Sequence, residues 1–113
     1  MTPDDEIEQL STKLGLMNEK QDWGIANADF ARTDEFIRCA LEANLTLAQQ
    51  YAMTELVLAS VNEAMLEGRF TQELKSSFSV FLRSELHGLP DQIRYWSKLS
   101  DHREFPLASF LKI

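Results

Sequence analysis

The sequence predicts an all-α protein, a single-domain bundle of four to five helices around one central buried helix at about residues 46–67. Three observations predict this fold. Apolar residues recur at three- and four-residue spacing along most of the chain, and no useful length of sequence alternates apolar and polar residues as a strand does. The length of 113 residues suits one domain. We therefore treat residues 1–113 as a single helical domain.

The first helix is expected to begin at the N-terminus of the chain. Thr2 is a suitable N-cap, Pro3 suits the first helical position, and the acidic residues that follow favour the positive end of the helix dipole. Gly15 is expected to end this helix. Residues 18–28 then predict a loop, and we expect Trp23 to anchor it to the core.

A second helix is predicted from Asp29 or Thr33 to about Ala43, with Asn44 as its stop. The link to the next helix is very short, so the two helices should form an antiparallel hairpin. The side chains expected to point inward are those of Phe36, Ile37, Ala40 and Leu41.

The central helix carries the clearest signals. Thr46 and Gln49 have the capping-box pattern, and Gly68 supplies a stop. At about 100° per residue, its polar residues gather on one narrow face that we expect to meet water, whereas the broad opposite sector should be covered by other helices. The residues of the narrow face are Gln49, Ser60, Glu63 and Glu67.

Two polar residues interrupt the apolar sector of this helix. Glu55 and Asn62 are seven residues apart, so they share one stripe and should be at least partly buried. An unpaired buried carboxylate is costly, so Glu55 should bind a loop N–H, an indole N–H or an arginine. We favour this structural interpretation. The alternative is that Glu55 and Asn62 line a ligand cavity.

The last third of the chain predicts two more helices and a docked tail. Thr71 is expected to cap a helix that extends through Leu86 and ends at Gly88. A short helix should begin at Pro90. Residues 105–113 are too apolar for a free end, so we expect them to pack on the body of the protein or on a second copy.

The net charge of −7 is concentrated near the N-terminus, where residues 1–35 hold nine acidic and three basic side chains. Such a protein is repelled by nucleic acid and by anionic membrane surfaces, so neither is an expected partner, whereas a basic protein is. No apolar stretch is long enough to span a bilayer, and the acidic start does not resemble a secretory signal. With Cys39 as the single cysteine, we expect a cytoplasmic protein.

The histidines, the cysteine and the glycines that could form catalytic or cofactor sites are few and isolated in this sequence. His87 and His102 have no metal-ligand partner at helical spacing, so no metal is expected. Cys39 lies in mid-helix among apolar residues and is expected to be structural. The glycines are isolated and form no phosphate-binding loop. We therefore expect no cofactor, no catalytic residue and no enzymatic activity.

Three short segments carry a resemblance to a known group of proteins: Asp22-Trp23-Gly24-Ile25, Glu55-Leu56-Val57-Leu58-Ala59-Ser60 and Tyr95-Trp96-Ser97. Together they resemble small uncharacterised bacterial helical proteins, some of them of the immunity-protein type. The resemblance implies a non-enzymatic protein that neutralises another protein, and it assigns no functional residues.

The leading functional hypothesis is a non-enzymatic protein-binding module of immunity or antitoxin type that neutralises a basic partner. Acidic charge would accelerate association and aromatic anchors would slow dissociation. Its candidate contacts are Asp22, Trp23, Asp29, Asp34 and Glu35, where acidic charge and an aromatic side chain coincide.

Two alternatives come from other functional classes. The first is a homodimeric structural or regulatory protein that associates through the C-terminal tail. The second is a small-molecule binder that uses Glu55 and Asn62.

Overall fold

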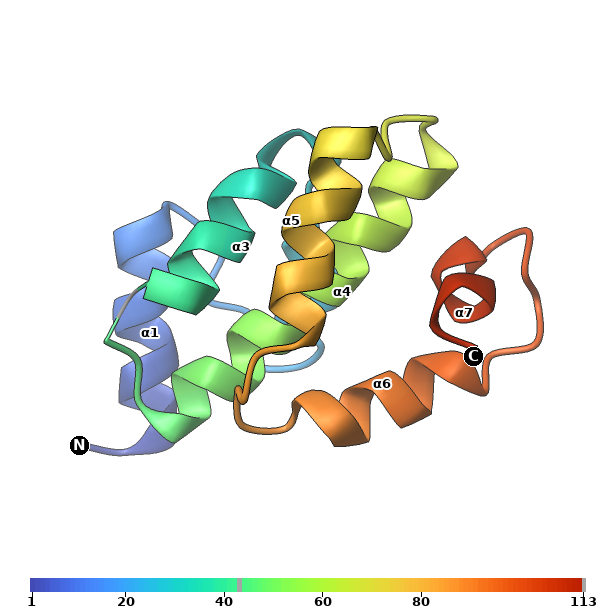
Figure 1. Ribbon diagram of the computed structural model, residues 1–113. Helices are drawn as coiled ribbons and strands as arrows, with labels where there is room; N and C mark the ends of the chain where they lie inside the picture. The colour runs from blue at the N-terminus through green and yellow to red at the C-terminus, as the bar shows by residue number, and fades with distance from the viewer. Residues whose placement is uncertain (43, 113) are drawn as a thin grey trace.

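The structure, a computed structural model that describes residues 1–42 and 44–112, is all-α (Figure 1). The predicted fold class is confirmed, with two short helices, α2 and α7, in addition to five longer ones. Ala43, the predicted end of the second helix, and Ile113 of the tail lie outside the described residues. The elements are α1 (Pro3–Leu14), α2 (Trp23–Ala26), the 3-10 helix η1 (Phe30–Arg32), α3 (Thr33–Glu42), α4 (Leu47–Leu66), α5 (Gln72–Leu82), α6 (Leu89–Ser97) and α7 (Pro106–Leu111).

The predicted N-caps Thr2, Thr46 and Thr71 are confirmed, and the first two each form a reciprocal pair of hydrogen bonds. In α1 the Thr2 hydroxyl accepts from the Asp5 N–H at 3.2 Å, while the Thr2 N–H donates to the Asp5 carboxylate at 3.1 Å. In α4, Thr46 and Gln49 make the same two bonds. Gly15 ends α1 in the left-handed conformation, with φ 68°. These bonds satisfy N–H groups that helix ends otherwise leave unpaired.

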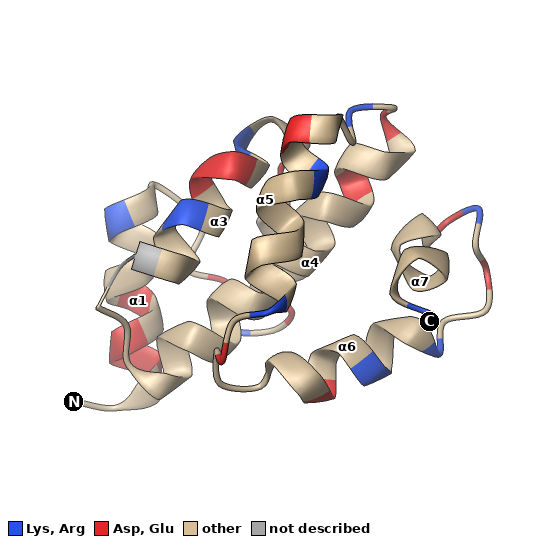
Figure 2. Ribbon diagram, in the orientation of Figure 1, with Lys and Arg blue, Asp and Glu red and all other residues tan. Residues whose placement is uncertain are grey.

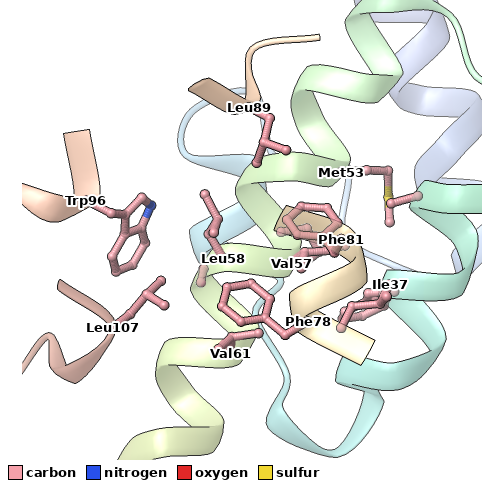
Figure 3. Packing of buried hydrophobic residues seen from close by; sticks show 14 of the residues in the cluster. Ile37, Met53, Val57, Leu58, Val61, Phe78, Phe81, Leu89, Trp96 and Leu107 are labelled. Carbon is pink, nitrogen blue, oxygen red and sulfur yellow. The ribbon is translucent and has the colours of Figure 1, made fainter. Parts of the chain in front are cut away.

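The helix α4 is the central element, as predicted. It packs against α1, α2, α3, η1, α6 and α7, whereas α5 packs against α3. In Figure 3, Trp96 and Leu107 approach α4 from one side, and Ile37 and Phe78 approach it from another. The side chain of Leu58 on α4 is fully buried. Burying apolar surface on all these sides is the main source of stability for a helix of this composition.

Two of the four residues on the narrow polar face predicted for α4 are buried and do not meet water. Gln49 is 9% exposed and Ser60 is fully buried. The Gln49 amide donates to the Glu6 carbonyl at 2.8 Å, and the Ser60 hydroxyl accepts from the Asp29 N–H at 3.1 Å. The prediction was wrong for these two residues because each has a hydrogen-bonding partner in a distant segment, which removes the cost of burial.

Two further predictions need correction. The helix α5 ends at Leu82 and does not reach Leu86. The chain that follows turns back to α4, where the His87 N–H donates to Gln50 Oε1 at 3.0 Å. Leu41, expected to point inward, is 38% exposed.

The C-terminal segment docks on the same chain. Leu107 and Ala108 are fully buried, and the rings of Trp96 and Phe105 meet edge to face at 6.1 Å. In Figure 1, α6 and α7 lie together, and both helices contact α4. Of the two arrangements expected for the tail, the structure shows packing on the body. None of the helices in the described ranges is both long enough and apolar enough to cross a bilayer.

Candidate binding groove

A groove of about 690 Å³ runs between α1, the loop that precedes α2, and the first half of α4. We name it the acidic groove because six carboxylates line it, whereas Lys20 and His87 are its basic groups. The sequence predicts a role for two of these six carboxylates, Glu55 as a partly buried residue and Asp22 as a contact with a partner. The six are Asp4, Asp5, Glu8, Glu19, Asp22 and Glu55.

Half of these carboxylates belong to the N-terminal half of α1, whose acidic residues appear in Figure 2. Acidic side chains are favourable there because they face the positive end of the helix dipole. The Thr2 backbone N–H, which donates to Asp5, holds the pKa of that carboxyl below its usual value. Asp5 therefore keeps its negative charge to lower pH than an ordinary aspartate does.

Asp22 enters the groove from an unusual backbone conformation. Its φ of 52° is the one positive value among the described residues other than glycine. Although Asp22 occupies the N-cap position of α2, its side chain makes no capping hydrogen bond. The carboxylate is therefore exposed at the groove and free of any bond to the N–H groups of α2. Aspartate is one of the few residues that tolerate this region.

Trp23 was expected both to anchor the loop and to contact a partner. The first expectation is confirmed, because Trp23 is only 6% exposed and its indole N–H donates to the Ser11 hydroxyl at 2.8 Å. The second needs correction. The ring forms part of the groove wall but is almost entirely buried, so it is a core residue and not an exposed aromatic anchor.

Glu55 has a hydrogen-bonding partner, as predicted, and of the three expected kinds it is a backbone N–H. Its Oε1 accepts from the Gly24 N–H at 2.6 Å, which joins the start of α2 to the middle of α4. The close approach depends on glycine, because a Cβ on Gly24 would lie 2.6 Å from the Leu56 nitrogen. The bond orients the carboxylate, and Glu55 Oε2 has no hydrogen-bonding partner among the described residues.

The sequence interpretation missed the groove's exposed apolar surface. Leu47 is 62% exposed and Tyr51 is 46% exposed, although the helical pattern placed both in the buried sector of α4. Leu47, Tyr51 and Glu55 follow one another at four-residue intervals, which is the spacing of one stripe on a helix. This spacing, together with the acidic outer face of α1, is the signal that could have identified the groove.

The other predicted contacts lie outside the acidic groove. Asp34 is exposed on a separate hollow of about 440 Å³, which Arg69 also lines. Asp29 accepts from the Ala31 N–H and so caps η1. The Arg32 guanidinium, hydrogen-bonded to Glu35, lowers the pKa of that carboxyl. The five predicted contacts therefore form no single surface.

Asn62 has a different role from Glu55. It is 4% exposed, and its amide donates to the Glu104 carbonyl at 3.1 Å while its oxygen accepts from the Leu107 N–H at 3.1 Å. It therefore holds the start of α7 against α4. Because both ends of its amide are used in this way, Asn62 does not line the acidic groove with Glu55.

We expect Asn62→Ala to lower the free energy of unfolding by about 2 kcal/mol, since the buried Leu107 N–H and the partly buried Glu104 carbonyl would lose their partner. Urea unfolding measures this change. Gln72→Ala, at an exposed position of α5, is the control and should change stability by less than about 0.5 kcal/mol. Equal effects of the two variants would contradict the role assigned to Asn62.

His, Cys, Asp and Glu side chains that could form a metal site are scattered over the described parts of the chain. Within residues 1–42 and 44–112, no group of three or more His, Cys, Asp and Glu side chains is placed to hold a metal ion. Cys39 is partly buried in α3, and burial raises the pKa of its thiol. A raised thiol pKa lowers the fraction of reactive thiolate at neutral pH.

No family model matches the chain, and comparisons with curated proteins and with solved structures found no match either.

Proposed function

We propose that this chain is a non-enzymatic binding protein that takes basic side chains of a protein partner into the acidic groove. The observation that supports the proposal is the composition of the groove, with six carboxylates around exposed Leu47 and Tyr51. Apolar and aromatic groups inside a charged rim are the common arrangement of a protein-binding surface. The carboxylates would act through their charge.

The proposed partner is a protein because the charge of the groove disfavours the other large classes of ligand. The groove and the net charge of −7 would repel phosphates of nucleic acid and anionic lipid surfaces. They would attract a basic protein, and this attraction increases association rates. A cytoplasmic immunity or antitoxin role in a bacterium, in which the chain neutralises a basic toxin, is the form of binding that we favour.

The two alternative functions are less well supported by the geometry. The C-terminal tail that would join two copies packs on its own chain, with Leu107 fully buried. A cavity shared by Glu55 and Asn62 is also not supported, because these residues bind different segments, α2 and the start of α7. The described residues of the tail do not line the acidic groove, and of the pair Glu55 and Asn62 only Glu55 does.

The test is capture of a basic protein from lysate of the source cells by three forms of the chain. The groove variant carries Glu8→Gln, Glu19→Gln and Asp22→Asn, all at exposed positions. Three exposed ion pairs of about 0.5 kcal/mol each correspond to about tenfold in Kd, so the groove variant should bind about tenfold more weakly than the unchanged chain. Binding by the unchanged chain should also weaken at high salt.

The matched control loses the same charge outside the groove. It carries Glu67→Gln, Glu73→Gln and Glu104→Gln, also at exposed positions. It should bind as the unchanged chain does. Equal loss in both variants would show that net charge alone causes binding, and an undiminished Kd in the groove variant would refute the proposed surface.

A further inference from the structure

We propose that the acidic groove is selective for arginine, with a guanidinium stacked on the Tyr51 ring and hydrogen-bonded to Glu55. This inference rests on the proposed function and specifies the chemical group that the groove recognises. Tyr51 and Glu55 both line the groove and are four residues apart on α4, so they are neighbours on one helical face. An exposed ring beside a carboxylate combines the two groups that bind a guanidinium best.

The Tyr51 ring is held in place although it is 46% exposed. Gly88 lies against the ring, where an added Cβ would be 2.3 Å from Tyr51 Cδ2. The centroid of the His87 ring is 6.3 Å from that of Tyr51. The Gln92 amide donates to the Tyr51 backbone carbonyl at 3.0 Å, which ties the backbone at this position to α6. A ring that is already oriented loses little conformational entropy when a ligand stacks on it.

The Glu55 carboxylate is also oriented before any ligand binds. Its Oε1 is fixed by the Gly24 N–H at 2.6 Å, and its Oε2 has no hydrogen-bonding partner in the described parts of the chain. Asp22, the residue that precedes α2, adds a second exposed carboxylate to the same groove. The groove therefore offers one carboxylate of fixed position, Glu55, and a second exposed carboxylate, Asp22, on the walls that also carry the Tyr51 ring.

Arginine fits these groups better than lysine does. A guanidinium is planar and weakly hydrated, so it stacks on an aromatic ring while its N–H groups donate to carboxylates in the same plane. A lysine ammonium is compact and strongly hydrated, so it gains from the negative charge but less from the ring. The charge of the groove attracts both side chains, and Tyr51 should distinguish them.

The probes are two peptides of equal charge, hexa-arginine and hexa-lysine with blocked termini, titrated into the full chain and followed by isothermal titration calorimetry. We expect hexa-arginine to bind about tenfold more tightly than hexa-lysine. Tyr51→Leu should weaken the binding of hexa-arginine alone, so that the two peptides then bind with equal Kd values. Tyr51→Phe keeps the aromatic face and should keep the ratio. Tyr95→Leu removes an exposed ring of α6 outside the groove and should change neither Kd.

Three results would overturn the inference: equal Kd values for the two peptides with the unchanged chain, an unchanged ratio in Tyr51→Leu, or no binding of either peptide. Circular dichroism of each variant verifies that the helical content is kept. Equal Kd values that rise together in the groove variant would overturn arginine selectivity and leave the proposed function standing. The proposed function itself is tested by a different experiment, the capture of the protein partner.

Discussion

Gly24→Ala is expected to lower the free energy of unfolding by about 3 kcal/mol, since it forces overlap between two backbones. The added Cβ would lie 2.6 Å from the Leu56 nitrogen and 2.8 Å from the Glu55 carbonyl carbon, both of them atoms of the α4 backbone. Helix α4 is packed against α1, α3, α6 and α7 as well as α2, and these contacts oppose its displacement. The first helical turn of α2 should therefore shift outward and lengthen the bond from the Gly24 N–H to Glu55.

Urea unfolding of Gly24→Ala measures this loss of stability, and Gly15→Ala is the matched control. Gly15 has a positive φ of 68°, but nothing lies within 4 Å of an added Cβ. Its replacement should cost about 1 kcal/mol through backbone strain alone. A smaller loss for Gly24→Ala than for Gly15→Ala would contradict the close contact between α2 and α4.

Phe78→Ala is expected to lower the free energy of unfolding by about 4 kcal/mol because it leaves a cavity in the core. The side chain is fully buried, and its ring contacts three others. Its centroid lies 6.2 Å from that of Phe70, 5.9 Å from Phe81 and 5.8 Å from Phe110. The loss should therefore loosen α5 and the end of α7 together.

The control for Phe78→Ala is Val80→Ala, which lies on the same helix but is 49% exposed. Its replacement should change stability by less than about 0.5 kcal/mol. Thermal unfolding of both variants gives the comparison, and similar Tm values would exclude the buried position assigned to Phe78.

Local sequence signals predicted the main helices and their caps. Thr2 and Thr46 cap their helices as predicted, and Thr46 forms the predicted capping box with Gln49, because capping depends on residues three positions apart. The sequence predicts a loop where the short helix α2 forms, since four residues cannot form a stable helix by themselves. The helix exists because Trp23 is buried and the Gly24 N–H binds Glu55.

The acidic groove could be predicted only in part, because its wall comes from segments that are distant in sequence. The excess of acidic side chains in residues 1–35 was evident, and Asp22 was named as a contact. The pattern of α4 could not show that Tyr51 stays exposed, since helical periodicity records polarity and not which sides neighbouring helices leave open. Burial of Ser60 depends in the same way on the distant N–H of Asp29.

The polar residues of α4 limit the number of compact arrangements that the chain can adopt. An apolar helix face accepts many neighbouring helices with similar energy, so it favours compactness without choosing one packing. Each buried or partly buried polar side chain, in contrast, is satisfied by one partner segment and is costly with any other. These side chains thus separate the native arrangement from competing compact ones in energy. They assign neighbours as follows: Gln49 to α1, Glu55 to α2, Ser60 to the start of η1, Asn62 to α7.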